Sequence, residues 1–158
     1  MTTELITSWA EHDKALRKIL QTLSRSLRIF DEDLTGLHLE SAEFAGQLRS
    51  FLAARTSNSV NIVLRSTDAF RRNSPRLMLL LKTYPERMMV SEVPPHLASL
   101  TDNFVVVDDA SALIRFHRDN VRSKAIYDDA SGCSLYTKRF EELLKEGGEQ
   151  LSATTLGL

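Results

Sequence analysis

The stretch TDNFVVVDDASALIRFHRD, residues 101–119, constrains the fold of this chain more than any other segment. Its FVVV run predicts a buried strand, and the alternating SALIRFH predicts a second strand beside it. Between them lies a short Asp-Asp-Ala-Ser segment, whose residues favour a tight turn. The two strands are therefore expected to form a hairpin that adds an antiparallel element to a sheet.

Segments with helical and strand periodicity alternate along the rest of the chain. Helices are expected at 3–23, 41–55, 75–84 and 135–147, a turn or short helix at 67–73, and further strands at 26–31, 60–66 and 87–93. This order favours an α/β fold, a layered domain with a mixed, mostly parallel sheet flanked by helices. We expect residues 1–25 to form an N-terminal amphipathic helix, 26–147 the α/β domain and 148–158 a flexible tail.

Composition narrows the class of protein. The 158 residues are 42% hydrophobic and 26% charged, which fits one globular domain. The net charge of −1 disfavours nucleic acid and anionic membranes as partners. The sequence has no apolar run of the ~20 residues that a membrane span needs, and its N-terminus does not resemble a signal peptide. A cytoplasmic location is expected.

The sequence offers little material for a metal or cofactor site. The single cysteine, Cys133, cannot form an internal disulfide or a cysteine cage, and the four histidines are scattered without ligand spacing. Glycine-rich phosphate loops, the GxSxG elbow and the HExxH motif are missing from the sequence. We therefore expect neither a metal nor a cofactor.

The hairpin with its closing helix resembles the phospholipase D superfamily. The motif of those enzymes is HxKxxxxD, followed about six residues later by GSxN, and its histidine is the nucleophile while its lysine binds phosphate. With Asp108 at the aspartate of the motif, the histidine position is Thr101 and the lysine position is Asn103. The Gly-Ser pair falls on Arg115-Phe116, and the asparagine falls on Arg118.

This alignment implies a degenerate active site in which Asp108 alone survives. A threonine hydroxyl without an adjacent base cannot replace an imidazole nucleophile at neutral pH. Asn103 brings no positive charge to a phosphate. The resemblance therefore implies a phospholipase-D-like fold with no catalytic residues, and we expect the protein not to be an enzyme.

A second resemblance covers about residues 26–146. The segments LRIFD, VNIVLRS, FVVVDD…LIR and RFEELL, with the arginines around Arg72 and Arg76, are similar to an uncharacterised bacterial domain of this fold. That domain is often fused to or found beside GNAT-type acetyltransferases, which implies an acetyltransferase as a partner. Because related phospholipase-like halves pair face to face, the resemblance also implies a homodimer.

Two basic stretches are candidate binding regions, and each follows a predicted strand. Ligands of open α/β sheets bind at the carboxyl ends of strands, so convergence of Arg65 and Arg115 there would create an anion-binding cleft. The N-terminus of the helix that begins at Pro75 would support it. The ligand-binding candidates are Arg65, Arg72, Arg76, Asp108, Arg115, His117 and Arg118. The alternative is that these arginines pair with the 21 acidic residues at the surface.

Arg115 is the candidate with the clearest physical constraint. It shares one strand face with Leu113, so it needs a buried acidic partner, which Asp108 or Asp31 could supply. A structural ion pair and a ligand contact both remain open for this residue. Cys133 is expected to be inert packing.

These observations favour a non-catalytic binding or regulatory module, with an anionic or phosphorylated small molecule as the expected ligand. One alternative is a phosphodiesterase or nuclease that uses His96 or His117 in a shifted site. Another alternative is a structural partner of an acetyltransferase.

Overall fold

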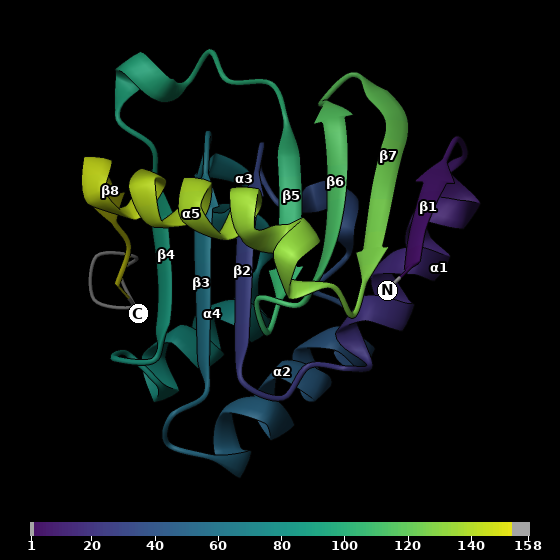
Figure 1. The fold of residues 1–158 in the computed structure, drawn as a ribbon. Coiled ribbons are helices and arrows are strands. Elements are labelled where there is room, and N and C mark those ends of the chain that lie inside the picture. The colour runs from purple at the N-terminus through teal and green to yellow at the C-terminus, as the bar shows by residue number, and fades with distance from the viewer. Residues whose placement is uncertain (1, 153–158) are drawn as a thin grey trace.

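An eight-stranded mixed sheet forms the centre of the protein in a computed structural model, which describes residues 2–152. The strands lie in the order β1-β7-β6-β5-β2-β3-β4-β8 (Figure 1). Their bounds are β1 Thr2–Ile6, β2 Ser26–Asp31, β3 Ser59–Leu64, β4 Met88–Glu92, β5 Asn103–Val107, β6 Ser111–His117, β7 Asn120–Tyr127 and β8 Glu149–Gln150.

Helices cover both faces of this sheet. The helices are α1 Trp9–Leu20, α2 Ala42–Ala54, α3 Asp68–Asn73, α4 Pro75–Thr83 and α5 Ala130–Glu146, with short 3₁₀ turns η1 Thr35–Leu37 and η2 Pro95–Leu97. Helix α5 crosses one face of the sheet, while α1, α2 and α4 lie on the other (Figure 1). The expected layered α/β domain with a mixed sheet is confirmed.

The parallel part of the sheet is smaller than expected. Strands β2, β3 and β4 are parallel to one another, whereas β5 enters antiparallel to β2 and the remaining pairings are also antiparallel. Since β5, β6 and β7 follow one another through short turns, they must alternate in direction. The strand that carries the FVVV run lies between β6 and β2, in the interior of the sheet.

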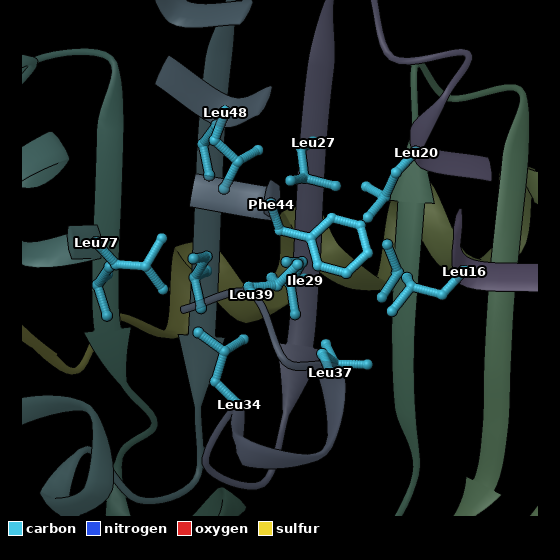
Figure 2. Packing of buried hydrophobic residues seen from close by; sticks show 14 of the residues in the cluster. Leu16, Leu20, Leu27, Ile29, Leu34, Leu37, Leu39, Phe44, Leu48 and Leu77 are labelled. Carbon is cyan, nitrogen blue, oxygen red and sulfur yellow. The ribbon is translucent and has the colours of Figure 1, made fainter. Parts of the chain in front are cut away.

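Two hydrophobic clusters, one on each face, hold the layers together. The larger cluster packs α1, α2 and α4 against side chains such as Ile29 and Leu27 of β2 (Figure 2). The smaller cluster packs α5 against Phe30 and Phe104. Ile29 and Phe30 are neighbours on opposite faces, as the period of two residues in a strand requires.

The sequence prediction missed three strands, β1, β7 and the short β8. The expected helix at 3–23 is instead strand β1 followed by α1, because Thr2–Ile6 pairs with β7 and Ser8 caps the helix. The N-terminal segment therefore adds a strand, residues 2–6, to the central sheet. Strand β7 lies in a stretch for which no strand was predicted, because its exposed polar side chains interrupt the apolar pattern of the buried Ala125 and Ile126.

The C-terminal part also differs from expectation. Helix α5 begins earlier than predicted, at Ala130, because the Asp129 side chain accepts a hydrogen bond from Gly132 N. Leu135, expected to point inward, is exposed. In the expected tail, β8 pairs with β4 and Leu151 is buried, while residues 153–158 lie outside the described part of the chain. Among residues 2–152, none of the helices has the length and apolar character needed to cross a membrane.

Candidate functional site

Three polar residues, Asp31, Asn103 and Arg115, lie side by side on the adjacent strands β2, β5 and β6. They lie at the end of the sheet where β2 finishes. Asn103 pairs directly with Arg115, and Phe104 pairs with Phe30, which places Asp31 beside Asn103. Because β5 runs antiparallel to β2, its first residue meets the carboxyl end of that strand. We call this group, together with Glu32, Arg65 and Arg118, the polar edge.

Arg115 has its acidic partner in Asp31, one of the two residues expected for that role. Its guanidinium nitrogen lies 3.9 Å from the Asp31 carboxylate, and only 11% of the Arg115 side chain is exposed. Arg115 also donates to the carbonyl oxygens of His117 (3.4 Å) and Arg118. The other Asp31 oxygen accepts a hydrogen bond from Leu34 N at 2.8 Å.

Arg65 and Arg118 share a second internal partner, Glu32. Arg65 Nε lies 3.2 Å from Glu32 Oε2, and an Arg118 nitrogen lies 2.9 Å from the same oxygen. Arg65 is nearly buried, and it also donates to the Asp102 carbonyl (2.8 Å) and to Asn103 Oδ1. Arg65 and Arg115 therefore converge as expected, but internal carboxylates engage their positive charges.

Helix α1 supplies two site residues that the sequence prediction missed. Trp9 is half exposed, its ring lies under the Arg115 guanidinium at 5.4 Å, and it contacts the ring of His12 edge-on. His12 is buried, with 2% of its surface exposed. The signal in the sequence was their spacing of three residues, which places both on one face of a helix.

A polar hollow of about 520 Å³ opens at the polar edge. This volume is within the usual range for small-molecule sites. Its walls are Trp9, Arg115 and Arg118 together with the acidic side chains Asp31, Glu32, Asp33 and Asp119, along with Thr35 and Gly36. Acidic groups thus outnumber basic ones around the hollow.

Several groups with displaced pKa values gather here, which is a common property of functional sites. Burial raises the pKa of Asp31 and lowers the pKa of His12, and the nearby Arg115 lowers the latter further. Burial acts to raise the pKa of Glu32, but hydrogen bonds from Arg118 and Arg65 outweigh it and hold that pKa below its ordinary value. Burial also lowers the pKa of Arg115.

Asp108, which the sequence alignment placed at the aspartate of the phospholipase D motif, lies just after the opposite end of β5 from Asn103. Its side chain accepts hydrogen bonds from the backbone N–H groups of Ser24 (3.1 Å), Arg25 (2.7 Å) and Ser26 (3.0 Å) and from the Ser24 hydroxyl (2.9 Å). The expectation that Asp108 could pair with Arg115 is therefore wrong, because β5 carries its two ends to opposite edges. Asp108 connects the β5–β6 turn to the start of β2.

Arg72 and Arg76 also lie away from the polar edge, on α3 and α4. The expected anion at the N-terminus of α4 is already present within the chain, because the Glu40 carboxylate accepts from Arg76 N (2.7 Å) and Leu77 N (3.1 Å). Arg76 lines a separate groove of about 250 Å³ between α2 and α4. Arg72 is exposed.

The remaining candidates are dispersed. His117 is exposed at the end of β6, 3.7 Å from the Asp119 carboxylate, whereas His96 lies 3.3 Å from Glu146 at the end of α5. The structure therefore places them beside different elements. Cys133 is buried, and burial together with nearby carboxylates raises its pKa to about 11, so this thiol is inert packing at neutral pH as expected.

Asn103 belongs to the polar edge, and Thr101 lies next to it. The sequence alignment placed these two residues at the lysine and histidine positions of the phospholipase D motif. The Thr101 carbonyl accepts the backbone N–H of Arg118 at 2.7 Å. The Asn103 side chain is buried and its oxygen accepts from Arg65. The arrangement can hold a polar molecule through hydrogen bonds and aromatic contact, but its amide and hydroxyl groups cannot perform nucleophilic attack as an imidazole does.

Comparison with protein families gives one match. The family described as "Domain of unknown function (DUF7931)" matches residues 8–152. A search of curated proteins finds no match.

Solved structures with this fold include a phospholipase D family member, the protein NucT and an archaeal chromatin protein. The phospholipase D family member Nuc from Salmonella typhimurium is 10% identical, with a TM-score of 0.61 over 96% of this chain and 98% of its own. NucT from Helicobacter pylori is 14% identical, with a TM-score of 0.62 over 94% and 98%. These matches confirm the phospholipase-D-like fold.

The archaeal chromatin protein TrmBL2, described with a novel mode of DNA binding, is 11% identical with a TM-score of 0.68. The match covers 96% of this chain but 54% of the TrmBL2 chain, so this chain spans about half of that protein. The expectation that nucleic acid is disfavoured as a partner is not confirmed, since one structural neighbour is a DNA-binding protein.

Proposed function

The chain belongs to the family described as a domain of unknown function (DUF7931), and we propose that it is a non-catalytic module that binds a small polar ligand in the hollow. The strongest support is the composition of the polar edge. Thr101 and Asn103 stand where the phospholipase D motif has its nucleophile and its phosphate-binding lysine. The hollow has the size of a ligand site, and groups with displaced pKa values surround it.

The charge of the ligand can be argued from the ion pairs. An anionic or phosphorylated ligand must displace Glu32 from Arg118, an exposed pair of the kind that contributes little to stability. It must also approach Asp33 and Asp119, whose carboxylates repel it. A neutral polar ligand needs no such displacement. Binding of both classes is therefore compared in the test.

The only tryptophan of the sequence lies in the wall of the hollow, so it reports on binding. We expect a ligand to change Trp9 fluorescence saturably and to raise the melting temperature. Arg118→Ala should raise the dissociation constant of that ligand by about tenfold, which is the effect of losing one good hydrogen bond. The matched control is Arg122→Ala, an exposed arginine on β7. Equal effects of the two substitutions would place binding elsewhere.

A phosphodiesterase or nuclease is the second candidate, because one structural neighbour is a phospholipase D family member and His117 lies beside Asp119. Assays with bis(p-nitrophenyl) phosphate and single-stranded DNA distinguish the two functions. We expect no turnover by the wild-type protein. Cleavage without added metal that disappears in the double variant His96→Ala/His117→Ala would replace our proposal. Gel-shift titration with duplex DNA tests the binding role that TrmBL2 suggests.

Two assembly properties also belong to this proposal. We propose a homodimer, by analogy with paired phospholipase-like domains, and light scattering at several protein concentrations measures it. The acetyltransferase partner rests on the resemblance alone, and copurification from cells tests it. A monomer at all concentrations, or the absence of an acetyltransferase from the eluate, would remove the corresponding property without affecting the hollow.

A further inference from the structure

Two residues with a buried polar atom that lacks a hydrogen-bond partner line the same small cavity next to the hollow. Among residues 2–152, three buried side-chain nitrogen or oxygen atoms lack a partner, and two of them are His12 Nδ1 and Asn103 Nδ2. Both residues line a cavity of about 10 Å³, together with Asp31 and Arg115. Buried polar groups are almost always satisfied, so this pair calls for an occupant.

The free atoms define the chemistry of that occupant. The Asn103 oxygen accepts from Arg65, which leaves its NH₂ group as the unpaired donor of a residue that lines the cavity. The pKa of His12 lies below its ordinary value, so its imidazole is neutral at pH 7 and one of its ring nitrogens is an acceptor. The neighbouring Asp13 carboxylate lies 3.9 Å from His12 Nδ1, beyond hydrogen-bond distance. A group that can both accept and donate a hydrogen bond satisfies the two atoms together. A hydroxyl group and a water molecule meet this requirement.

Size and charge restrict the occupant further. A cavity of about 10 Å³ accommodates roughly one water-sized oxygen atom. A net charge is disfavoured there, because Asp31 and Arg115 already balance each other at 3.9 Å. These same two residues also line the hollow, so the cavity and the hollow share a wall.

We propose that Asn103 and His12 form an anchoring subsite for one hydroxyl group of a neutral polyol bound in the hollow, where water resides when the ligand is absent. The inference rests on the proposed function and specifies its ligand class. The ion pairs of Glu32 and Asp31 stay intact when such a ligand binds, and Trp9 offers an apolar surface for its carbon atoms.

Nuclear magnetic resonance of the wild-type protein tests the subsite directly, with glycerol and xylitol as probes and glycerol 3-phosphate as the anionic reference. The Asn103 side-chain amide and the His12 ring nitrogens are expected to shift saturably with a neutral polyol. Trp9 fluorescence should titrate with the same dissociation constant. The phosphate ester should bind more weakly than the polyol.

Variants provide a second measurement. His12→Phe and Asn103→Leu each remove one anchoring atom and should weaken polyol binding by about tenfold, while His96→Phe, at an exposed site, should leave it unchanged. Circular dichroism identifies a variant that fails to fold. In that case the Asn103 and His12 resonances of the wild-type protein decide whether the subsite exists.

The possible outcomes separate the two proposals. If glycerol 3-phosphate titrates Trp9 while Asn103 and His12 resonances stay fixed with all probes, the hollow binds a ligand but the hydroxyl subsite is refuted. If no probe moves Trp9, Asn103 or His12, both the subsite and the polyol-binding hollow are refuted. Equal weakening by His12→Phe and His96→Phe would also refute the subsite.

Discussion

At the scale of single residues, Asp108 and His12 have roles that their sequence context does not show. Asp108 has a positive φ of 56°, and its carboxylate accepts from three successive backbone N–H groups at the start of β2. His12 is one of four scattered histidines in the sequence, yet the fold buries it at the polar edge. Residues 24–26, which bond Asp108, and Arg115, which acts on His12, are distant in sequence, so only the folded chain reveals these roles.

Replacement of Asp108 should destabilise the protein without affecting the hollow. Asp108→Ala removes hydrogen bonds to a charged acceptor and is expected to lower the free energy of unfolding by about 2–4 kcal/mol. Asp108→Asn keeps one acceptor oxygen in a residue type that tolerates positive φ, so its loss of unfolding free energy should be smaller. Urea denaturation measures both variants. A ligand-binding defect with unchanged stability would contradict this structural role.

His12 should make stability depend on pH below neutrality. Its pKa in the folded protein lies below the ordinary value of 6.5, so the unfolded chain binds the proton more readily. The stabilising contribution is therefore present above about pH 6.5 and is lost as the pH falls towards the folded pKa. Burial and Arg115 oppose the charge, while Asp13 favours it.

The measurement is the urea midpoint of the wild type at pH 7.5 and pH 5.5. We expect a lower midpoint at pH 5.5 and a smaller difference between the two values in His12→Phe. His96→Phe is the matched control and should follow the wild type. Identical pH dependence in all three proteins would exclude His12 as the titrating group.

At the scale of elements, periodicity predicted most helices and strands but missed β1 and β7 at one side of the sheet and β8 at the other. Strand β2, helix α2 and the β5–β6 hairpin occur where their patterns indicated. Strand β7 could not be recognised because it lies next to the edge strand β1, where exposed side chains interrupt the apolar pattern. Strand β1 resembles the start of a helix until its partner β7 is known.

The sequence pattern was also insufficient to predict the contacts within the candidate site. Strand assignment correctly placed Arg65 and Arg115 near strand ends, but the partners of these arginines depend on register. Asp31 meets Arg115 because β5 lies between their strands and aligns both with Asn103. A sequence pattern contains no information on this lateral row.

Gly148 should be essential for the attachment of the last strand. Its φ is +122°, and an added Cβ would lie 2.0 Å from the backbone oxygen of Glu92. Gly148→Ala should therefore detach β8 and expose Leu151, with a loss of about 1–3 kcal/mol. Gly147 has a φ of +81° but open space around it, so Gly147→Ala should cost about 1 kcal/mol. Thermal denaturation compares the two, and equal losses would contradict the clash.

At the scale of the whole molecule, the described sheet ends in two very different strands. Strand β8 has two residues, whereas β1 has five and covers the eight-residue β7. Within β1, the Ile6 side chain is fully buried, while Leu5 is 57% exposed. The N-terminal strand therefore protects a long hydrogen-bonding edge from other chains.

Removal of residues 1–7 should expose that edge and promote aggregation. We expect increased light scattering at concentrations where the full chain is clear, and a loss of about 2–3 kcal/mol from the lost burial of Ile6 and its neighbours. Leu5→Ser keeps the strand while removing its exposed apolar side chain, and it should scatter no more than the full chain. A soluble, equally stable truncated protein would show that β1 has no protective role.

The position of Asp108, at the opposite end of β5 from Asn103, bears on what an aspartate at this place in the fold can tell. Its four hydrogen-bond donors are the Ser24 hydroxyl and three backbone groups at the start of β2, so the side chain has a use in folding that is independent of any nucleophile. A chain of this fold can therefore need the aspartate whether or not it performs a reaction. The residue reports on the framework and is silent about chemistry.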